Sequence, residues 1–285
     1  MTTLAPLPAL CYEPLLLAAL EEDVGRGGDI SALVIPADKK AILHLVTRED
    51  GCIAGLNMSL RAFTLFDPKV EVIPLVTDGQ TVKAGDVLAT VSGPVRSLLG
   101  AERTCLNLLG HLCGIATQTQ ALKALIANLP AQLVDTRKTL PGLRHLQKYA
   151  VRAGGGHNHR FALDDAVMLK DNHLALAGDI ATAVATARAA VGPMVKVEVE
   201  VDTLAQLTEV LKTDADVVML DNMKPDMLKK AVAMVGGKML TEASGGVTAK
   251  TIRAVAEAGV DIISVGALTH SVTQLDIGLD YKENP

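Results

Sequence analysis

A dense group of basic side chains lies in the middle of the chain, where residues 135–170 read DTRKTLPGLRHLQKYAVRAGGGHNHRFALDDAVMLK. From Thr136 to Lys170 there are seven Lys and Arg residues and two acids, a local charge of about +5 in a chain whose formal net charge is −5. Overall acidity disfavours a nucleic-acid surface, whereas a confined positive region concentrates its field on one spot. The sequence therefore predicts a small polyanionic ligand, such as a carboxylate or a phosphate.

Five side chains of this stretch are candidates for holding the polyanion. Arginine donates two parallel hydrogen bonds to a carboxylate, and lysine supplies a compact charge for a phosphate, so the set suits a dicarboxylate and part of a phosphorylated partner. Zinc is the alternative for the histidines, but no Cys or carboxylate lies at ligand spacing from them, so we favour an anion site. The candidates are Arg137, Lys138, His159, Arg160 and Lys170.

Two glycine-containing loops near the C-terminus predict a phosphate site. They read EASGGV at residues 242–247 and SVGAL at residues 264–268. In a β/α barrel the last loops and a helix N-terminus bind phosphate through backbone N–H groups, which glycine leaves accessible.

Two acids, Glu200 and Asp221, are expected inside this basic surrounding, where opposing charge keeps them ionised. Carboxylates there can accept hydrogen bonds from sugar hydroxyls, bind Mg²⁺ that arrives with a pyrophosphate, or stabilise a cationic sugar transition state. The alternative is that they only neutralise nearby Arg and Lys. Strand alternation points Glu198 the same way as Glu200, and we assign it no role.

The elements that must position these residues follow a repeated pattern from about residue 130 onward. Short apolar runs alternate with longer helical patterns, as in βα units, and strands that are apolar on both faces indicate a parallel sheet. Polar residues follow each run, and the carboxyl ends of barrel strands converge on one mouth. A helix N-cap is the alternative at Asp171 and Asn222. The apolar runs are 133–134, 166–169, 195–201, 216–220, 238–241 and 261–265, and the helical patterns are 180–191, 204–212, 225–235 and 249–258.

The N-terminal part has a different pattern. Residues 41–99 alternate as strands do and contain turn residues at Asp78-Gly79, which predicts an antiparallel sheet. Residues 98–129 read as a helix that carries Arg103 beside an apolar face.

Composition excludes several classes of protein. No apolar run approaches the roughly 20 residues of a membrane span, and no basic residue precedes Arg26 as in a secretory signal, so we expect a cytoplasmic protein without a membrane role. Four scattered cysteines do not make a disulfide framework. The core must come from aliphatic residues, since 49% of the chain is hydrophobic but only 2% aromatic.

Several motifs together resemble the quinolinate phosphoribosyltransferase family, in order and over residues 15–280. They are EEDVGRGGDIS at 21–31, DTRKTLPGLR at 135–144, QKYAVRAGGGHNHR at 147–160, LKDNH at 169–173, EVEV at 198–201, LDN at 220–222 and EASGGV at 242–247.

The resemblance implies an α/β protein with two domains. These would be an N-terminal open α/β sandwich at 1–112, on which the tail 271–285 packs, and an incomplete seven-stranded parallel β/α barrel at 113–270. It also implies transfer of phosphoribose from 5-phosphoribosyl 1-pyrophosphate (PRPP) to quinolinate. The products would be nicotinate mononucleotide, pyrophosphate and CO₂, made for NAD biosynthesis with Mg²⁺ accompanying PRPP.

Residue roles are carried over from the resemblance. Lys138, Glu200 and Asp221 would be catalytic, with Lys138 in contact with PRPP and the two acids at the ribose hydroxyls or the metal. Arg103 would reach the site of a neighbouring subunit, which implies a homodimer and leaves a hexamer open. The quinolinate carboxylates would be bound by Arg137, His159, Arg160 and Lys170, and the remaining substrate contacts would come from Thr136, Ser244, Gly245, Gly246, Gly266 and Ala267.

Two other functions fit the same pattern. One is a phosphoribosyltransferase of the same fold with a different acceptor, which the four carboxylate-binding candidates disfavour. The other is a metabolite-binding protein without turnover, in which carboxylates such as Glu200 and Asp221 would add nothing to anion capture.

Overall fold

The computed structural model describes residues 4–281, and the chain forms two compact units. The first unit contains the chain up to Gln120, Leu140–Gly155 and the chain from Leu268 onward. The second contains Ala121–Thr139 and Gly156–Ala267. This division differs from the domain boundaries expected from the sequence, at residues 112 and 270. The segment from Leu140 to Gly155 belongs to the same unit as the N-terminal part of the chain.

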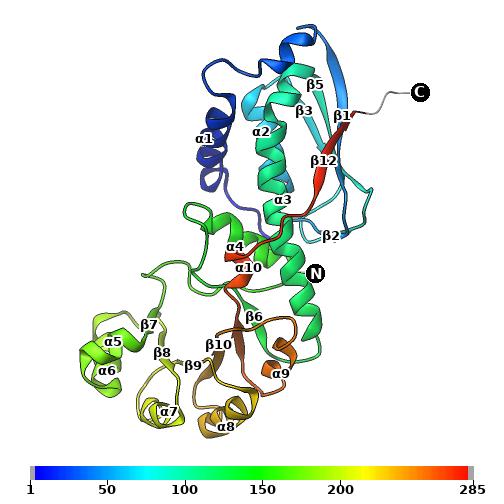
Figure 1. The fold of residues 1–285 in the computed structure, drawn as a ribbon. Helices are drawn as coiled ribbons and strands as arrows, with labels where there is room; N and C mark the ends of the chain where they lie inside the picture. Colours follow the sequence, from blue (N-terminus) through cyan, green and yellow to red (C-terminus); the bar gives the residue numbers. More distant parts are fainter. Residues whose placement is uncertain (1–3, 282–285) are drawn as a thin grey trace. The chain divides into compact units, whose positions relative to one another are not determined.

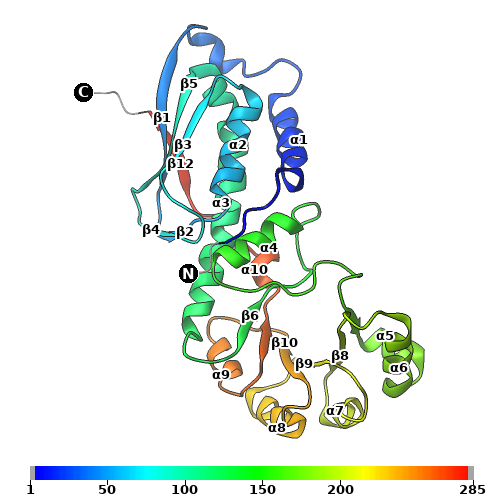
Figure 2. The same cartoon turned by 180° about the vertical axis from the view of Figure 1, so that it is seen from behind.

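The first unit is built on an antiparallel sheet with the strand order β12-β1-β5-β3 (Figure 1). The C-terminal strand β12 pairs with β1, so residues 277–281 complete this sheet. A separate two-stranded pair, β2 and β4, lies beside it (Figure 2). The strands are β1 (Lys40–Thr47), β2 (Gly51–Cys52), β3 (Glu71–Pro74), β4 (Thr81–Val82), β5 (Val87–Pro94) and β12 (Ile277–Tyr281).

Helices pack on this sheet through aliphatic side chains and Phe63, which is fully buried. The 31-residue helix α3 runs through the first unit, and its last residues belong to the second. Gly154 packs against it, since a Cβ there would overlap the carbonyl oxygen of Ala116, so this glycine serves helix packing. The helices are η1 (Ala9–Cys11), α1 (Glu13–Val24), η2 (Ser31–Val34), α2 (Leu56–Phe66), α3 (Val95–Leu125), α4 (Arg144–Ala153) and α10 (Ala267–His270).

The second unit is a parallel sheet with the strand order β6-β11-β10-β9-β8-β7. Beyond β6, a single parallel bridge joins Val134 to His157. In the described chain the expected seventh strand is therefore reduced to this bridge, and the barrel is incomplete. The strands are β6 (Gln132–Val134), β7 (Val167–Leu169), β8 (Val197–Val201), β9 (Val217–Asp221), β10 (Leu240–Ser244) and β11 (Ile262–Ser264).

Helices follow the strands of the second unit in βα order and lie on one side of its sheet (Figure 1). Local sequence starts two of them: the Asp179 carboxylate accepts the Thr182 N–H, and Thr203 forms a capping box with Gln206. No helix between residues 4 and 281 combines the length and apolar character needed to cross a bilayer. The helices are α5 (Asp171–Ala177), α6 (Ile180–Ala190), α7 (Leu204–Val210), α8 (Pro225–Val235) and α9 (Ile252–Ala256).

Asp216 directly precedes β9, and its carboxylate binds the start of β8 and a side chain of α6. Its carboxylate accepts the Val197 N–H at 2.8 Å, an Arg188 N–H at 2.6 Å and the Lys196 ammonium at 2.9 Å. Burial opposes its charge, but these donors outweigh that cost and lower the pKa of Asp216 to about 2. The Asp216 contacts therefore fix the register of β8 against β9 at their amino-terminal ends, and this register determines where the carboxyl ends of the two strands lie.

Replacing Asp216 by Asn is expected to lower the free energy of unfolding at pH 7 by about 1–2 kcal/mol. The folded-state pKa lies below the unfolded value, so this stabilisation is present above about pH 4 and is lost as the pH falls toward 2. Urea unfolding followed by circular dichroism should show the difference between the two proteins narrowing over that range. Asp214→Asn is the control, because Asp214 also contacts Arg188 but is 66% exposed, and a change below about 0.5 kcal/mol is expected. Equal losses in the two variants would contradict the assignment.

Candidate active site

A cavity of about 580 Å³ opens at the carboxyl ends of the strands in the second unit. It contains basic side chains, carboxylates and the first glycine loop in one place. Gly266 and Ala267 follow β11 outside its lining, and Arg103 lies on α3 in the first unit. The cavity is lined by Thr136, Arg137, Lys138, His159, Arg160, Met168, Lys170, Glu200, Met219, Asp221, Asn222, Glu242, Ser244, Gly245, Gly246 and Ser264.

The two-residue period of the strands selects which side chains enter the cavity. Side chains two apart in a strand share a face, so Met168 and Lys170 both line the cavity, as do Met219 and Asp221. The same period puts Glu198 on the face of Glu200, one step deeper in the sheet, where it is 4% exposed.

A fully buried carboxylate, Asp135, joins the two chain segments that carry the basic residues. Its oxygens accept the Asn158 side-chain N–H at 2.6 Å and the His159 backbone N–H at 2.9 Å. Asp135 directly precedes the segment that carries Arg137, so both arginine-bearing segments are fixed to one carboxylate. Asp135 was not among the site residues predicted from the sequence; the signal that could have identified it is an acid at the first position after a buried strand.

The two arginines lie close enough to affect each other. Burial lowers the pKa of Arg160, and the positive charge of Arg137 lowers it further. One Nη of Arg160 donates to the Ala166 carbonyl at 2.7 Å. The Nε of Arg137 is buried without a hydrogen-bond partner within residues 4–281. Two guanidinium groups held together in this way favour a ligand with more than one negative charge.

The carboxylates at the mouth differ in their partners. Glu200 forms an ion pair with Lys170, so part of the expected ion-pair network exists. Burial raises the pKa of Asp221, and the charge of Glu200 raises it further. The Asn222 side chain donates to Asp221 at 2.6 Å. Because the negative charges of Glu200 and Asp221 repel each other, a cation or hydroxyl donors between the two carboxylates would be favoured.

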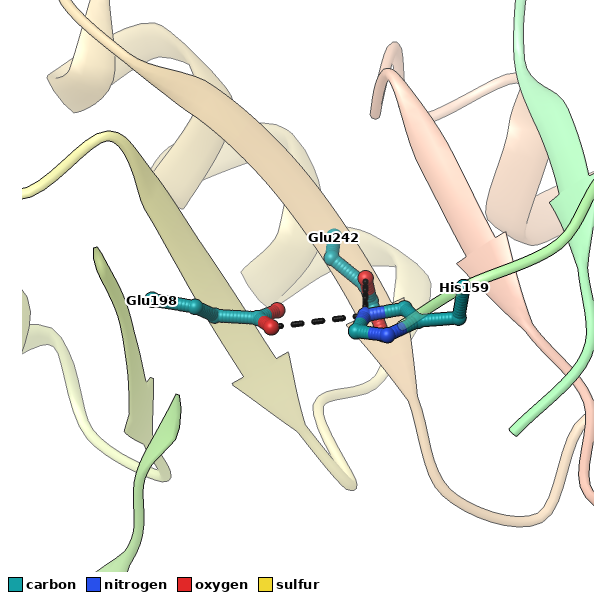
Figure 3. Close-up of side chains that lie close together, drawn as sticks. All are labelled: His159, Glu198 and Glu242. Carbon is teal, nitrogen blue, oxygen red and sulfur yellow. Dashed lines mark hydrogen bonds and ion pairs between the residues drawn. The ribbon is translucent and has the colours of Figure 1, made fainter. Parts of the chain in front are cut away.

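His159 lies between two buried glutamates (Figure 3). Its Nε2 is 3.1 Å from Glu242 Oε2 and 3.3 Å from Glu198 Oε2. Its Nδ1 accepts the backbone N–H of Arg160 at 2.8 Å. In the described chain, the Oε1 atoms of both glutamates are buried and lack hydrogen-bond partners.

The three side chains also have the composition of a metal site, with one ligand atom from each within 4.8 Å of the others. A metal on Nε2 of a neutral imidazole requires hydrogen on Nδ1, and that hydrogen would point at the Arg160 N–H. The amide contact therefore favours Nε2–H donating to the carboxylates over metal binding.

The proton balance of this cluster follows from the same contacts. Burial opposes extra positive charge on the ring, but the two carboxylates outweigh that cost, so the cluster of His159, Glu198 and Glu242 retains an extra proton. A proton on Nδ1 conflicts with the amide hydrogen bond from Arg160. We therefore place the extra proton between the carboxylates of Glu198 and Glu242. Burial raises the pKa of Glu198, which favours a proton there.

The glycine loop after β10 packs against the loop after β9. Gly245 has φ +95°, and a Cβ there would overlap the Asn222 side chain, whose own backbone has φ +54°. Asn222 N–H donates to the Ser244 carbonyl at 2.9 Å. The N-cap alternative for Asn222 is wrong because α8 begins at Pro225 after Lys224, and it is wrong for Asp171 because Lys170 occupies the cap of α5.

The fold and the cavity together define a β/α-barrel enzyme that acts on a small polyanion at the carboxyl ends of its strands. Family models match both parts of the chain: "Quinolinate phosphoribosyl transferase, N-terminal domain" over residues 29–113 and "C-terminal domain" over residues 115–280. The chain belongs to the quinolinate phosphoribosyltransferase family.

Individual relatives match over nearly the whole chain. A probable nicotinate-nucleotide pyrophosphorylase [carboxylating] of Bacillus subtilis is 43% identical over 91% of this chain and 89% of its own length. The solved NadC structure from Streptococcus pyogenes has a TM-score of 0.93 at 40% identity, covering 98% of this chain and 100% of that one. The nicotinate-nucleotide pyrophosphorylase from Francisella tularensis has a TM-score of 0.94 at 38% identity, covering 99% and 100%. The predicted fold class, an antiparallel N-terminal sheet domain followed by a parallel β/α domain, is confirmed.

Replacing Gly245 by Ala is expected to destabilise the protein by about 1–3 kcal/mol, because the new methyl group overlaps Asn222. Gly246→Ala is the matched control: its φ is also positive, at +59°, but no atom lies within 4 Å of the position that the new methyl group would take, so a cost near 1 kcal/mol is expected. Scanning calorimetry should show the larger fall in transition temperature for Gly245→Ala. A fall at least as large for Gly246→Ala would contradict the packing argument.

Proposed function

We propose that this chain transfers the phosphoribosyl group of PRPP to quinolinate with loss of CO₂, forming nicotinate mononucleotide and pyrophosphate in de novo NAD biosynthesis. One observation carries the proposal: a single cavity holds paired guanidinium groups beside two carboxylates and a glycine loop. These three features match a dicarboxylate, a ribose and a phosphate, respectively.

Residue roles follow from this arrangement. Arg137, Arg160 and Lys170 bind the two quinolinate carboxylates. His159 was also expected to bind them, but protein groups contact both of its ring nitrogens, so we place it in the wall beside them. Lys138, whose backbone N–H donates to Thr136 Oγ1 at 3.0 Å, contacts PRPP between the substrates. The 5′-phosphate is held by Ser244, Gly245 and Gly246, with Gly266 and Ala267 completing its surroundings.

The chemistry needs little from the protein beyond positioning and charge. The pyridine nitrogen attacks C1 of the ribose as pyrophosphate leaves, and the ring nitrogen becomes positive. That charge stabilises the electron pair left at C2 when the adjacent carboxylate departs as CO₂, and C2 then takes up a proton. Glu200 and Asp221 accept hydrogen bonds from the ribose hydroxyls and stabilise positive charge as it develops on the sugar.

Mg²⁺ fits the same corner of the cavity. Glu200 and Asp221 offer hard oxygen ligands, and the charge of Glu200 already raises the pKa of Asp221, so a cation there would be favoured. Held there with PRPP, Mg²⁺ would supply positive charge to the pyrophosphate leaving group.

The acceptor is the point on which relatives of this fold differ. Human nicotinic acid phosphoribosyltransferase has a TM-score of 0.59 at 16% identity, which shows a shared fold alone. The paired arginines favour a dicarboxylate over nicotinate, and Glu200 with Asp221 favours turnover over simple anion capture.

The purified protein, given PRPP and Mg²⁺, is expected to form nicotinate mononucleotide and CO₂ in equal amounts from quinolinate and no product from nicotinate. Chromatography of the nucleotide and trapping of labelled CO₂ measure the two products. Product from nicotinate alone would move the assignment to another acceptor, and binding of both substrates without product would indicate a metabolite-binding protein.

The homodimer is part of the proposal, with Arg103 completing the cavity of the partner subunit. Arg103→Ala and Arg137→Ala are each expected to lose at least about 100-fold in activity, since each removes a charge-assisted bidentate contact. Mixed after reversible dissociation, they should recover up to about a quarter of wild-type activity, because half of the dimers are hybrids and each hybrid has one intact site. Native mass spectrometry checks that hybrids form. Hybrids without recovered activity would contradict the shared site.

A further inference from the structure

His159, Glu198 and Glu242 form a buried cluster, and its contacts exceed those that His159 would need to bind a substrate. Glu198 is 4% exposed and Glu242 is fully buried, and both approach the same ring nitrogen. The other ring nitrogen is occupied by the Arg160 amide. Both nitrogens of His159 are therefore engaged by the protein, and neither is placed to donate to a substrate carboxylate.

The contacts continue from the ring to the arginine. The Arg160 backbone N–H is held by His159 Nδ1 at 2.8 Å, and its guanidinium is held by the Ala166 carbonyl at 2.7 Å. The residue is thus fixed at both ends while its side chain lines the cavity. Asp135 separately accepts a hydrogen bond from the His159 backbone N–H. The main chain of His159 is therefore held by Asp135, and its ring is held by the two glutamates and the Arg160 amide.

We propose that Glu198 and Glu242 are positioning residues for the acceptor site: they hold the His159 ring in its neutral Nε2–H form, and the ring, through Nδ1, sets Arg160 for the substrate carboxylate. The proposal rests on the proposed role of Arg160 as a carboxylate ligand. His159 acts as a fixed link and not as a cation. Its two acceptors lie on β8 and β10, the two strands that flank β9, and together they prevent the ring from turning toward either one alone.

The arrangement also predicts that a shift of Arg160 affects binding of quinolinate but not of PRPP. Glu242 lines the cavity beneath the basic side chains, so a carboxylate displaced from Arg160 would approach a buried acid. A small displacement of Arg160 therefore weakens carboxylate binding, while the PRPP contacts at the glycine loop and Lys138 are unaffected.

The first test measures the ring itself. ¹⁵N NMR of the full-length protein labelled at histidine, with the His159 signals identified from a His159→Phe sample, should show a protonated Nε2 and an unprotonated Nδ1 at pH 7. A ring protonated on both nitrogens, or on Nδ1 alone, would overturn the proposal without any variant of the glutamates.

The second test separates the two substrates by calorimetric titration. Glu242→Leu removes the acceptor and is expected to weaken quinolinate binding by at least about 10-fold, with PRPP binding changed by less than about 2-fold. Glu242→Gln keeps a carbonyl acceptor for Nε2–H and should stay within about 3-fold of wild type for both.

The outcomes distinguish this proposal from the assigned function. Unchanged quinolinate affinity in a folded Glu242→Leu protein, or equal losses for both substrates, would overturn the positioning role. If Glu242→Leu does not fold, Glu198→Leu takes its place with the same expectation. A wild-type protein that binds no quinolinate would refute the proposed function, while the NMR result would still report the state of the ring.

Discussion

The site depends on the convergence of parallel strands at one edge of a sheet. Six strands of the second unit run in the same direction, so the residues at or just beyond the carboxyl end of each strand arrive at the same mouth regardless of their separation in sequence. Lys170, Glu200, Asp221 and Ser244 line one cavity for this reason, although 74 residues separate the first from the last. Asp216 at the other end of the strands sets the register on which this convergence depends.

Charge is arranged in two layers within this cavity. Arginines and lysines supply the binding contacts, and Glu198 with Glu242 forms a buried acidic layer beneath them. An isolated buried carboxylate would be costly, and the cluster limits that cost by sharing the His159 Nε2–H and retaining a proton. The histidine between them therefore makes the acids tolerable in the core, and the acids, together with the Arg160 backbone N–H, hold the ring in place.

Glycine serves different purposes at different places in the chain. Gly154 allows the chain after α4 to approach α3 within the first unit, whereas Gly245 allows the loop after β10 to pack on Asn222 beside the cavity. Both positions would overlap a neighbour if they carried a Cβ. Gly246 has a positive φ and open space around it, so what it contributes is backbone conformation.

Sequence by itself determined the strands of the second unit and most of the residues that line the cavity, but it missed α2, which lies inside the stretch 41–99 that was read as strands. The period of the apolar runs predicted each strand of the second unit to within a few residues, because a strand buried on both faces must be apolar along its length. Charge density identified the stretch that contains Arg137 and Arg160, and their guanidinium chemistry implied the ligand class. Only the tertiary structure decided what depends on contacts between distant segments. It reduced the seventh strand to a bridge at His157, assigned the segment from Leu140 to Gly155 to the first unit, and brought Glu198 and Glu242 to His159. No local pattern contains this information, since hydrogen bonds between residues tens of positions apart form only when the sheet brings their strands together.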